Sequence, residues 1–174
     1  SYLLADCSAS LLRISVFRKG EIVYNKEAQI GGVNLTQDIM SNLDVSLEEA
    51  EKMKIKGASK ENADMYDMIL KTFLNNYSSE FLRAYQYFVT TAADPTIEKI
   101  YLTGGVASTP GLVDVLYKDL KENDTDSYVA KPIIARPISE KNKTGKISLS
   151  KFTNDESALF LATGLAIRHF LRKY

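Results

Sequence analysis

The chain lacks several features that mark particular classes of protein. It has one cysteine, Cys7, so no disulfide can form within it, which is typical of a reducing compartment. Its 22 basic and 22 acidic residues balance, so no net charge favours nucleic acid or an anionic membrane as a partner. No apolar run approaches the roughly 18 residues of a membrane span. These absences favour a globular protein of a reducing compartment.

The length of 174 residues fits one domain, and a domain of this size buries roughly 70% of the surface of its unfolded chain. Strand patterns cover residues 2–7, 11–17, 21–28, 97–102 and 132–135, and helix patterns cover 34–43, 46–56, 62–92, 110–122 and 155–172. Because the chain opens directly in a strand, we expect it to be a piece of a longer protein.

The order of these elements predicts an α/β fold. Three antiparallel strands precede two strands with crossover helices, which gives a mixed five-stranded sheet with flanking helices, the ribonuclease-H-like order. Helices within residues 33–60 form a small inserted subdomain of a single domain over residues 1–174. Aromatic residues at helical spacing over 62–92 predict a core face, while weak helix formers between Asn75 and Ser79 leave room for a kink or break.

A glycine-rich turn at residues 103–111 is the most informative motif. Gly104 and Gly105 follow an apolar strand, and without Cβ atoms they let a flat ring lie on the backbone. Thr109 is a predicted N-cap and Pro110 the predicted first residue of a helix, whose N-terminus favours anionic groups. This arrangement suits a nucleotide, and the alternative is the tight strand-to-helix turn that any α/β fold needs.

A second motif lies between the first two strands. Asp6 ends a buried strand, and small residues that include Ser8 and Ser10 follow it. Such a carboxylate can hold a Mg²⁺-bound water near a phosphate, and small residues let backbone N–H groups approach the phosphate oxygens. The alternative is an ordinary hairpin in which Asp6 caps the turn.

Glu51 and Lys54 lie three residues apart and therefore share one face of a predicted helix. Glu51 can accept a hydrogen bond from a ribose hydroxyl, and Lys54 can flank a base or a phosphate. The alternative is a surface ion pair worth roughly a few tenths of a kcal/mol. The sequence of this helix, taken alone, favours that alternative.

Read in order, these stretches resemble the signatures of the actin-like ATPase superfamily. Residues 50–57 resemble the adenosine-contacting helix of its bacterial members, residues 102–112 their adenosine motif, and residues 158–168 their connecting helix. Within the superfamily the chain is most similar to the PilM family of type IV pilus assembly. That closer likeness is carried by residues 31–39, 47–51 and 110–113.

The resemblance implies the C-terminal half of a two-half, ATP-binding protein. The site residues that it implies in this chain are Asp6, Ser8, Ser10, Glu51, Lys54, Gly104, Gly105 and Ser108. The glycine turn would hold base and ribose, the helix over residues 46–56 would close over them, and the first turn would face the phosphates and Mg²⁺. Asp6 would reach the metal through water, and no hydrolysis is expected from this half alone, because the opposite phosphate clamp is missing.

The resemblance also implies partners and one departure. The partners are the missing N-terminal half and a PilN-like cytoplasmic tail, bound mainly by that half, with self-association as a further possibility and no nucleic acid. The location is the bacterial cytoplasm, peripheral to the inner membrane through these partners. Ser8 stands where the family normally has glycine, and its Cβ would crowd a phosphate oxygen.

Three other interpretations stay open. The chain resembles FtsA, the cell-division relative, in the same motifs. A degenerate pocket would leave a scaffold without nucleotide. A ribonuclease-H-like nuclease would use Asp6 as a metal ligand, but two-metal chemistry needs several convergent carboxylates.

Overall fold

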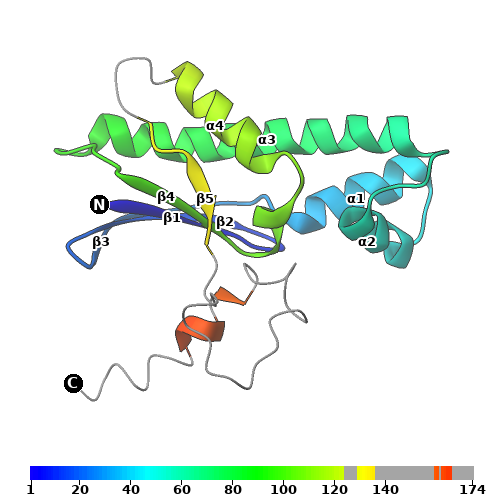
Figure 1. Cartoon of the computed structure of the whole chain (residues 1–174), viewed down its shortest axis with the longest axis horizontal. Helices are drawn as coiled ribbons and strands as arrows, with labels where there is room; N and C mark the ends of the chain where they lie inside the picture. Colours follow the sequence, from blue (N-terminus) through cyan, green and yellow to red (C-terminus); the bar gives the residue numbers. More distant parts are fainter. Residues whose placement is uncertain (124–128, 136–158, 161, 166–174) are drawn as a thin grey trace.

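The computed structural model describes residues 1–123, 129–135, 159–160 and 162–165. Its strands are β1 (Tyr2–Cys7), β2 (Leu12–Arg18), β3 (Glu21–Ala28), β4 (Lys99–Thr103) and β5 (Pro132–Ile134). Its helices are α1 (Gly32–Leu43), α2 (Leu47–Lys56), α3 (Ala63–Thr91), the short 3-10 helix η1 (Gly105–Ser108) and α4 (Leu112–Asn123). Figure 1 shows these elements in one view.

The five strands form one mixed sheet in the order β3-β2-β1-β4-β5. β1 pairs antiparallel with β2 and parallel with β4, while β2 pairs antiparallel with β3 and β4 parallel with β5. The predicted mixed sheet is therefore confirmed. In this register Asp6 lies between Arg13 of β2 and Thr103 of β4, so the first turn and the glycine turn leave the sheet side by side.

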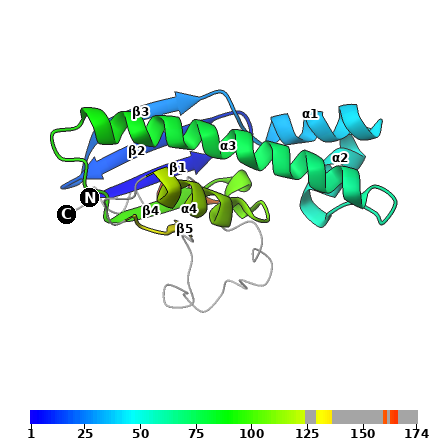
Figure 2. The ribbon, with the colours of Figure 1, turned by 90° about the horizontal axis from the view of Figure 1, so that it is seen from above.

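Helices α3 and α4 cover one face of the sheet (Figures 1 and 2). Alternate residues of β1, such as Leu3 and Cys7, are fully buried, as the period of two in a strand requires. The aromatic stripe of α3 supplies the opposing layer, and Tyr77 and Phe81 are likewise fully buried. The prediction of a core face on this helix is confirmed.

Helix α3 runs for 29 residues without a break, so the kink allowed for between Asn75 and Ser79 does not occur. The Ser79 hydroxyl donates to the Asn75 carbonyl 2.9 Å away, one helical turn earlier. Buried aromatic residues on both sides of this segment fix its face against the sheet, and such packing overrides weak local propensity.

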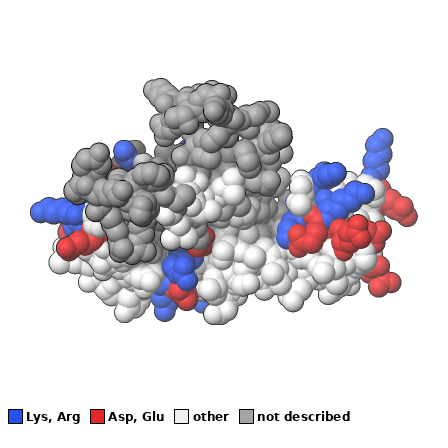
Figure 3. All heavy atoms as spheres, turned by 90° about the horizontal axis from the view of Figure 1, so that it is seen from below, with Lys and Arg blue, Asp and Glu red and all other residues white. Residues whose placement is uncertain are grey.

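Helices α1 and α2 lie beyond the ends of the strands, beside the N-terminal part of α3 (Figures 1 and 2). α2 begins with a capping box: the Glu49 N–H donates to Ser46 Oγ at 3.3 Å, and the Ser46 N–H donates to Glu49 Oε2 at 3.2 Å. Figure 3 shows basic and acidic side chains intermixed at this end of the molecule. The division into a body and an inserted subdomain stays a prediction.

Among the described residues no helix is both long and apolar enough to cross a membrane. The predicted final helix over residues 155–172 lies mostly outside the described residues. Within it, the Thr163 N–H donates to the Leu159 carbonyl at 2.9 Å, which is a helical spacing.

Candidate functional site

The turn between β1 and β2 is held from both sides by glycines. Gly104 has a φ of +90°, and a Cβ there would stand 2.3 Å from the Cys7 carbonyl oxygen and 3.1 Å from Asp6 Oδ1. A Cβ on Gly31 would stand 2.3 Å from the Ala9 carbonyl oxygen. Only glycine fits either contact, so Gly31 and Gly104 pack their backbones directly against this turn, one from each side.

Asp6 lies at the end of β1, where it faces the glycine turn. Its pKa is raised because burial disfavours the charged carboxylate, and Arg13 partly opposes that effect. The opposition is weak because Arg13 Nη1 is 3.9 Å from Asp6 Oδ2, while Arg13 Nε is 2.8 Å from Glu27 Oε1. Asp6 is therefore a partly buried carboxylate whose one ion pair among the described residues, with Arg13, is long.

Ser8 closes the turn on itself. Its hydroxyl donates to the Leu11 carbonyl at 2.8 Å, and the Leu11 N–H donates to Ser8 Oγ at 3.3 Å. The side chain predicted to face a phosphate is thus used within the turn. Ala9 and Ser10 are exposed at the tip, and the Ser10 hydroxyl has no hydrogen-bond partner among the described residues.

The turn also anchors α1. The Gly32 N–H donates to the Ser8 carbonyl at 3.3 Å, and the Val33 N–H donates to the Ala9 carbonyl at 2.8 Å. Two of the N–H groups that a helix leaves unpaired at its N-terminus are satisfied here. The start of α1 is fixed to the first turn and does not offer these two donors to a ligand.

Gly105 presents open space, unlike Gly104. No heavy atom of the described residues lies within 4 Å of a Cβ built on Gly105, and its φ is not positive. Gly105 and Ser108 are both exposed, and they bound the short helix η1. None of the described residues blocks the approach of a flat ring to the Gly105 backbone, and the binding of a ring there stays a prediction.

The helix after this turn begins later than predicted. Thr109 is extended, with a φ of −62° and a ψ of 128°, and its N–H donates to the Val106 carbonyl at 2.9 Å. Gly111 has a φ of +82°, a left-handed conformation that a right-handed helix does not contain. The assignment of Pro110 as the first helical residue is therefore wrong, and α4 starts at Leu112.

Thr36, Glu51 and Lys54 form a three-way polar cluster between α1 and α2. Lys54 Nζ donates to Glu51 Oε1 at 2.7 Å and to Thr36 Oγ1 at 2.8 Å, and Thr36 Oγ1 lies 2.6 Å from Glu51 Oε1. The pKa of Glu51 is lowered, first by its hydrogen bond from Lys54 and then by the one from Thr36. The pair is thus more than the surface ion pair that its spacing alone favours.

Gly32 joins this polar cluster to the turns. A Cβ on Gly32 would meet Val106 Cγ2 at 3.3 Å, Lys54 Nζ at 3.7 Å and Ala9 Cα at 3.9 Å. One bare backbone position therefore touches η1, α2 and the first turn at once. The predicted residues of all three motifs converge, although they lie up to about a hundred positions apart in sequence.

We call this convergence the candidate site, made of Asp6, Ser8, Ala9, Ser10, Gly32, Thr36, Glu51, Lys54, Gly104, Gly105, Val106 and Ser108. Four of its members, Ala9, Gly32, Thr36 and Val106, are not among the predicted site residues; Ala9 and Val106 lie inside the predicted site motifs, and Gly32 and Thr36 lie outside them. The only local signal for Gly32 and Thr36 is their spacing of four, which places both on one face of α1.

The candidate site combines a bare backbone platform, a carboxylate–ammonium pair and an exposed turn tip. Such a set suits a ring, a hydroxylated sugar and an anion respectively. Mg²⁺ keeps most of its waters and takes one or two carboxylates, so Asp6 alone fits a water-mediated metal. The described residues contain no group of three or more acidic, histidine or cysteine side chains that could bind a metal directly, so they hold no two-metal nuclease centre.

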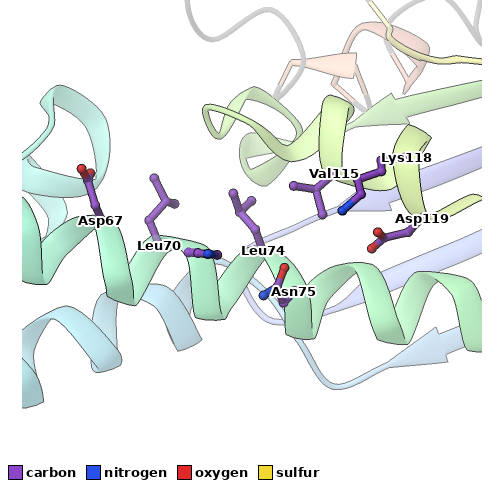
Figure 4. Close-up of a pocket in the computed structure, with 8 residues that line it drawn as sticks. Asp67, Leu70, Leu74, Asn75, Val115, Lys118 and Asp119 are labelled. Carbon is purple, nitrogen blue, oxygen red and sulfur yellow. The ribbon is translucent and has the colours of Figure 1, made fainter. Parts of the chain in front are cut away.

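A separate groove of about 310 Å³ lies between α3 and α4 (Figure 4). Leu70 and Leu74 of α3 and Val115 of α4 supply its apolar lining, and charged side chains such as Asp67 and Lys118 border it. None of the candidate-site residues lines this groove.

Comparison with known proteins fits this geometry. The sequence model of the family described as type IV pilus assembly protein PilM matches residues 1–170. The chain belongs to the PilM family. The match extends over the five strands, α1, α2 and every residue of the candidate site.

Solved structures share the fold. A structure of a PilM–PilN type IV pilus biogenesis complex is 18% identical, with a TM-score of 0.73, and the match covers 96% of this chain and 45% of that one. MreB5 of Spiroplasma citri bound to AMPPNP is 12% identical, with a TM-score of 0.64, over 99% and 54% of the two chains. The ethanolamine utilization protein EutJ of Carboxydothermus hydrogenoformans is 17% identical, with a TM-score of 0.61, over 95% and 48%.

These similarities establish an actin-like, ribonuclease-H-like ATPase fold. The chain spans about half the length of each of the three structures.

Proposed function

We propose that this chain is the C-terminal half of a PilM-like pilus assembly protein and supplies the adenosine side of an ATP site. Two observations carry the proposal: no described residue lies against the face of Gly105, and Gly32 brings Lys54 of the polar cluster close to Val106, the residue after Gly105. The fold neighbour MreB5 was solved with AMPPNP, which supports a nucleotide as the ligand of this fold.

In this proposal the base lies on Gly104 and Gly105, and Ser108 lies near the ribose. Glu51 and Lys54 contact the base and ribose from α2. Asp6 and Ser10 face the phosphates, with Mg²⁺ held through water by Asp6. Ser8 contributes its backbone only, because its hydroxyl is used within the turn.

The described part of this chain offers few hydrogen-bond donors to the phosphates. Ser8 and Leu11 donate their N–H groups within the turn, so the tip offers mainly the N–H groups of Ala9 and Ser10. We therefore infer that tight triphosphate binding and any hydrolysis need the other half of the protein, which supplies the opposite clamp.

We further propose that the complete protein acts in the cytoplasm at the inner membrane, where it binds a PilN-like tail. The PilM–PilN complex among the fold neighbours supports this kind of partner. The tail is expected to bind mainly to the first half, so this chain alone is expected to bind it weakly.

Titration of a fluorescent ATP analogue tests the proposal. Wild-type and Gly105→Arg forms are compared, both as this chain and joined to the first half. We expect the joined wild type to bind with at least about 100-fold higher affinity than the chain alone, because a second set of phosphate contacts adds roughly 3 kcal/mol or more. Gly105→Arg is expected to abolish binding, since its side chain enters the proposed ring-binding space and no described residue lies within 4 Å of its Cβ.

Met68→Arg is the matched control, because it adds the same charge at an exposed position on α3 that is not among the candidate-site residues. Equal, sub-micromolar binding to the chain and to the joined protein would refute the two-half proposal. If all forms melt alike and none binds nucleotide, the protein is a scaffold with a degenerate pocket. The occupied Ser8 hydroxyl favours that second candidate.

A further inference from the structure

We propose that Thr36 is a positioning residue of the nucleotide site: its buried hydroxyl sets Glu51 and Lys54 for contact with the ribose. This inference rests on the proposed nucleotide function, since it assigns a role within the same site. The residues on which it depends lie on two different helices, so the local sequence around Glu51 does not reveal it.

Thr36 is 2% exposed, and its oxygen has three close neighbours. They are Glu51 Oε1 at 2.6 Å, Lys54 Nζ at 2.8 Å and the Gly32 carbonyl oxygen at 3.0 Å. A hydroxyl has one proton to donate, and the Lys54 ammonium can only donate. Thr36 therefore accepts from Lys54 and donates to one of two oxygens, of which the carboxylate is closer and charged.

Both contacts to Glu51 use the same oxygen. Thr36 and Lys54 meet Oε1, and Oε2 has no partner among the described residues. The side chain of Glu51 is 44% exposed, so Oε2 is accessible. One carboxylate oxygen is thus anchored, while the other is presented in a fixed direction as an acceptor for a hydroxyl.

Lys54 is set in the same way. It uses two of its three protons on Thr36 and Glu51, and its side chain is 23% exposed. Its Nζ lies 3.7 Å from the position of a Cβ on Gly32, next to Val106 of η1. Thr36 therefore holds the ammonium at the junction with the glycine turn, where the proposed base and ribose lie.

A purely local role for Thr36 has a different signature. Threonine in a helix commonly donates to the carbonyl four residues earlier, as Thr72 does to Met68 at 2.9 Å. Thr72 has no partner on another element among the described residues, so Thr72→Val removes the same local bond and no inter-helix contact. It is the matched control for Thr36→Val.

The test uses the protein that contains this chain joined to its first half. Isothermal titration with Mg-ATP and with Mg-2′-deoxy-ATP is performed on the wild type, Thr36→Val, Thr36→Ser and Thr72→Val. We expect the wild type to prefer ATP by roughly 5- to 10-fold, the value of one hydrogen bond to a charged acceptor. Thr36→Val is expected to weaken ATP binding about 10-fold and to remove most of that preference.

Thr36→Ser and Thr72→Val are expected to keep both the affinity and the preference. A Thr36→Val protein that keeps the ribose preference overturns the inference and leaves the nucleotide site standing. A wild type that binds neither nucleotide overturns both. If Thr36→Val melts below the assay temperature, the test uses Glu51→Gln and Thr36→Ser instead. The inference requires that Glu51→Gln loses the preference for ATP over 2′-deoxy-ATP and that Thr36→Ser keeps it.

Discussion

The two sides of the candidate site are held in place by different means. On the turn side, Gly104 and Gly31 press their backbone against the Cys7 and Ala9 carbonyl groups, and no side chain could replace them. On the helical side, the hydroxyl, carboxylate and ammonium of Thr36, Glu51 and Lys54 hold one another. Backbone contacts of this kind tolerate no substitution, whereas a side-chain cluster can change without loss of the fold.

Gly104→Ala should have the largest effect on stability. A Cβ at a φ of +90° and 2.3 Å from the Cys7 carbonyl oxygen costs backbone strain and a steric clash together. We expect a loss of about 3 kcal/mol or more in the free energy of unfolding, measured by chemical denaturation. A loss below about 1 kcal/mol would show that the turn side is not held as described.

Asp6→Asn should act in the opposite direction at neutral pH. The folded-state pKa of Asp6 is raised, so its ionisation opposes folding above that pKa. We expect the variant to be up to about 1 kcal/mol more stable than the wild type at pH 7. The difference should shrink as pH falls through the raised pKa toward the ordinary aspartate range, and urea titrations at pH 4 to 8 measure it. A variant less stable at pH 7 would contradict the weak pairing with Arg13.

Glu51→Gln should cost less, because the polar cluster is partly exposed. The folded-state pKa of Glu51 is lowered, so its stabilisation is present above the ordinary glutamate pKa and is lost as pH falls through the lowered value. We expect about 0.5 kcal/mol of destabilisation at pH 7 and none once the pH lies below the lowered folded-state pKa. Thermal melts in 1 M salt, which screens the pair, should show a smaller difference.

Gly105→Ala should have the smallest effect on stability, within about 0.5 kcal/mol of the wild type. No described atom lies near its Cβ and its φ is ordinary, so neither clash nor strain arises. Melting of Gly104→Ala and Gly105→Ala side by side compares two adjacent glycines directly. Equal losses of stability in the two variants would mean that both glycines are needed only for the fold. The open face of Gly105 would then be no argument for a ligand.

Sequence patterns predicted the sheet well. The apolar stretches over residues 2–7, 11–17 and 21–28 predicted three antiparallel strands, and these strands pair in that way because the buried face of a strand dictates its register. The start of α4 was misplaced because proline is common as a first helical residue, while Gly111 takes a positive φ at a place where a Cβ would stand 3.3 Å from Leu74 Cδ1. Local preference gave no warning of that contact.

The side chains of the site were harder to predict than its backbone. Ser8 is small enough to approach a phosphate, yet its hydroxyl bonds to Leu11 three residues away, a competing local bond that serine often makes. Thr36 lies 15 residues from Glu51 and 18 from Lys54, so its role appears only when two helices are placed together. Interactions of this range are not encoded in a local pattern.

The central claim is that this chain carries the adenosine side of a nucleotide site at the glycine turn. The most direct measurement is a two-dimensional NMR titration of the 174-residue chain with millimolar Mg-ATP, following assigned backbone amides. The account predicts shifts at Gly32, Gly104, Gly105 and Ser10, with Gly20 and Gly57 unmoved as internal controls in other turns. The account would be contradicted if Gly32, Gly104 and Gly105 did not shift. It would also be contradicted if the shifts centred on Leu70 and Val115, in the groove between α3 and α4.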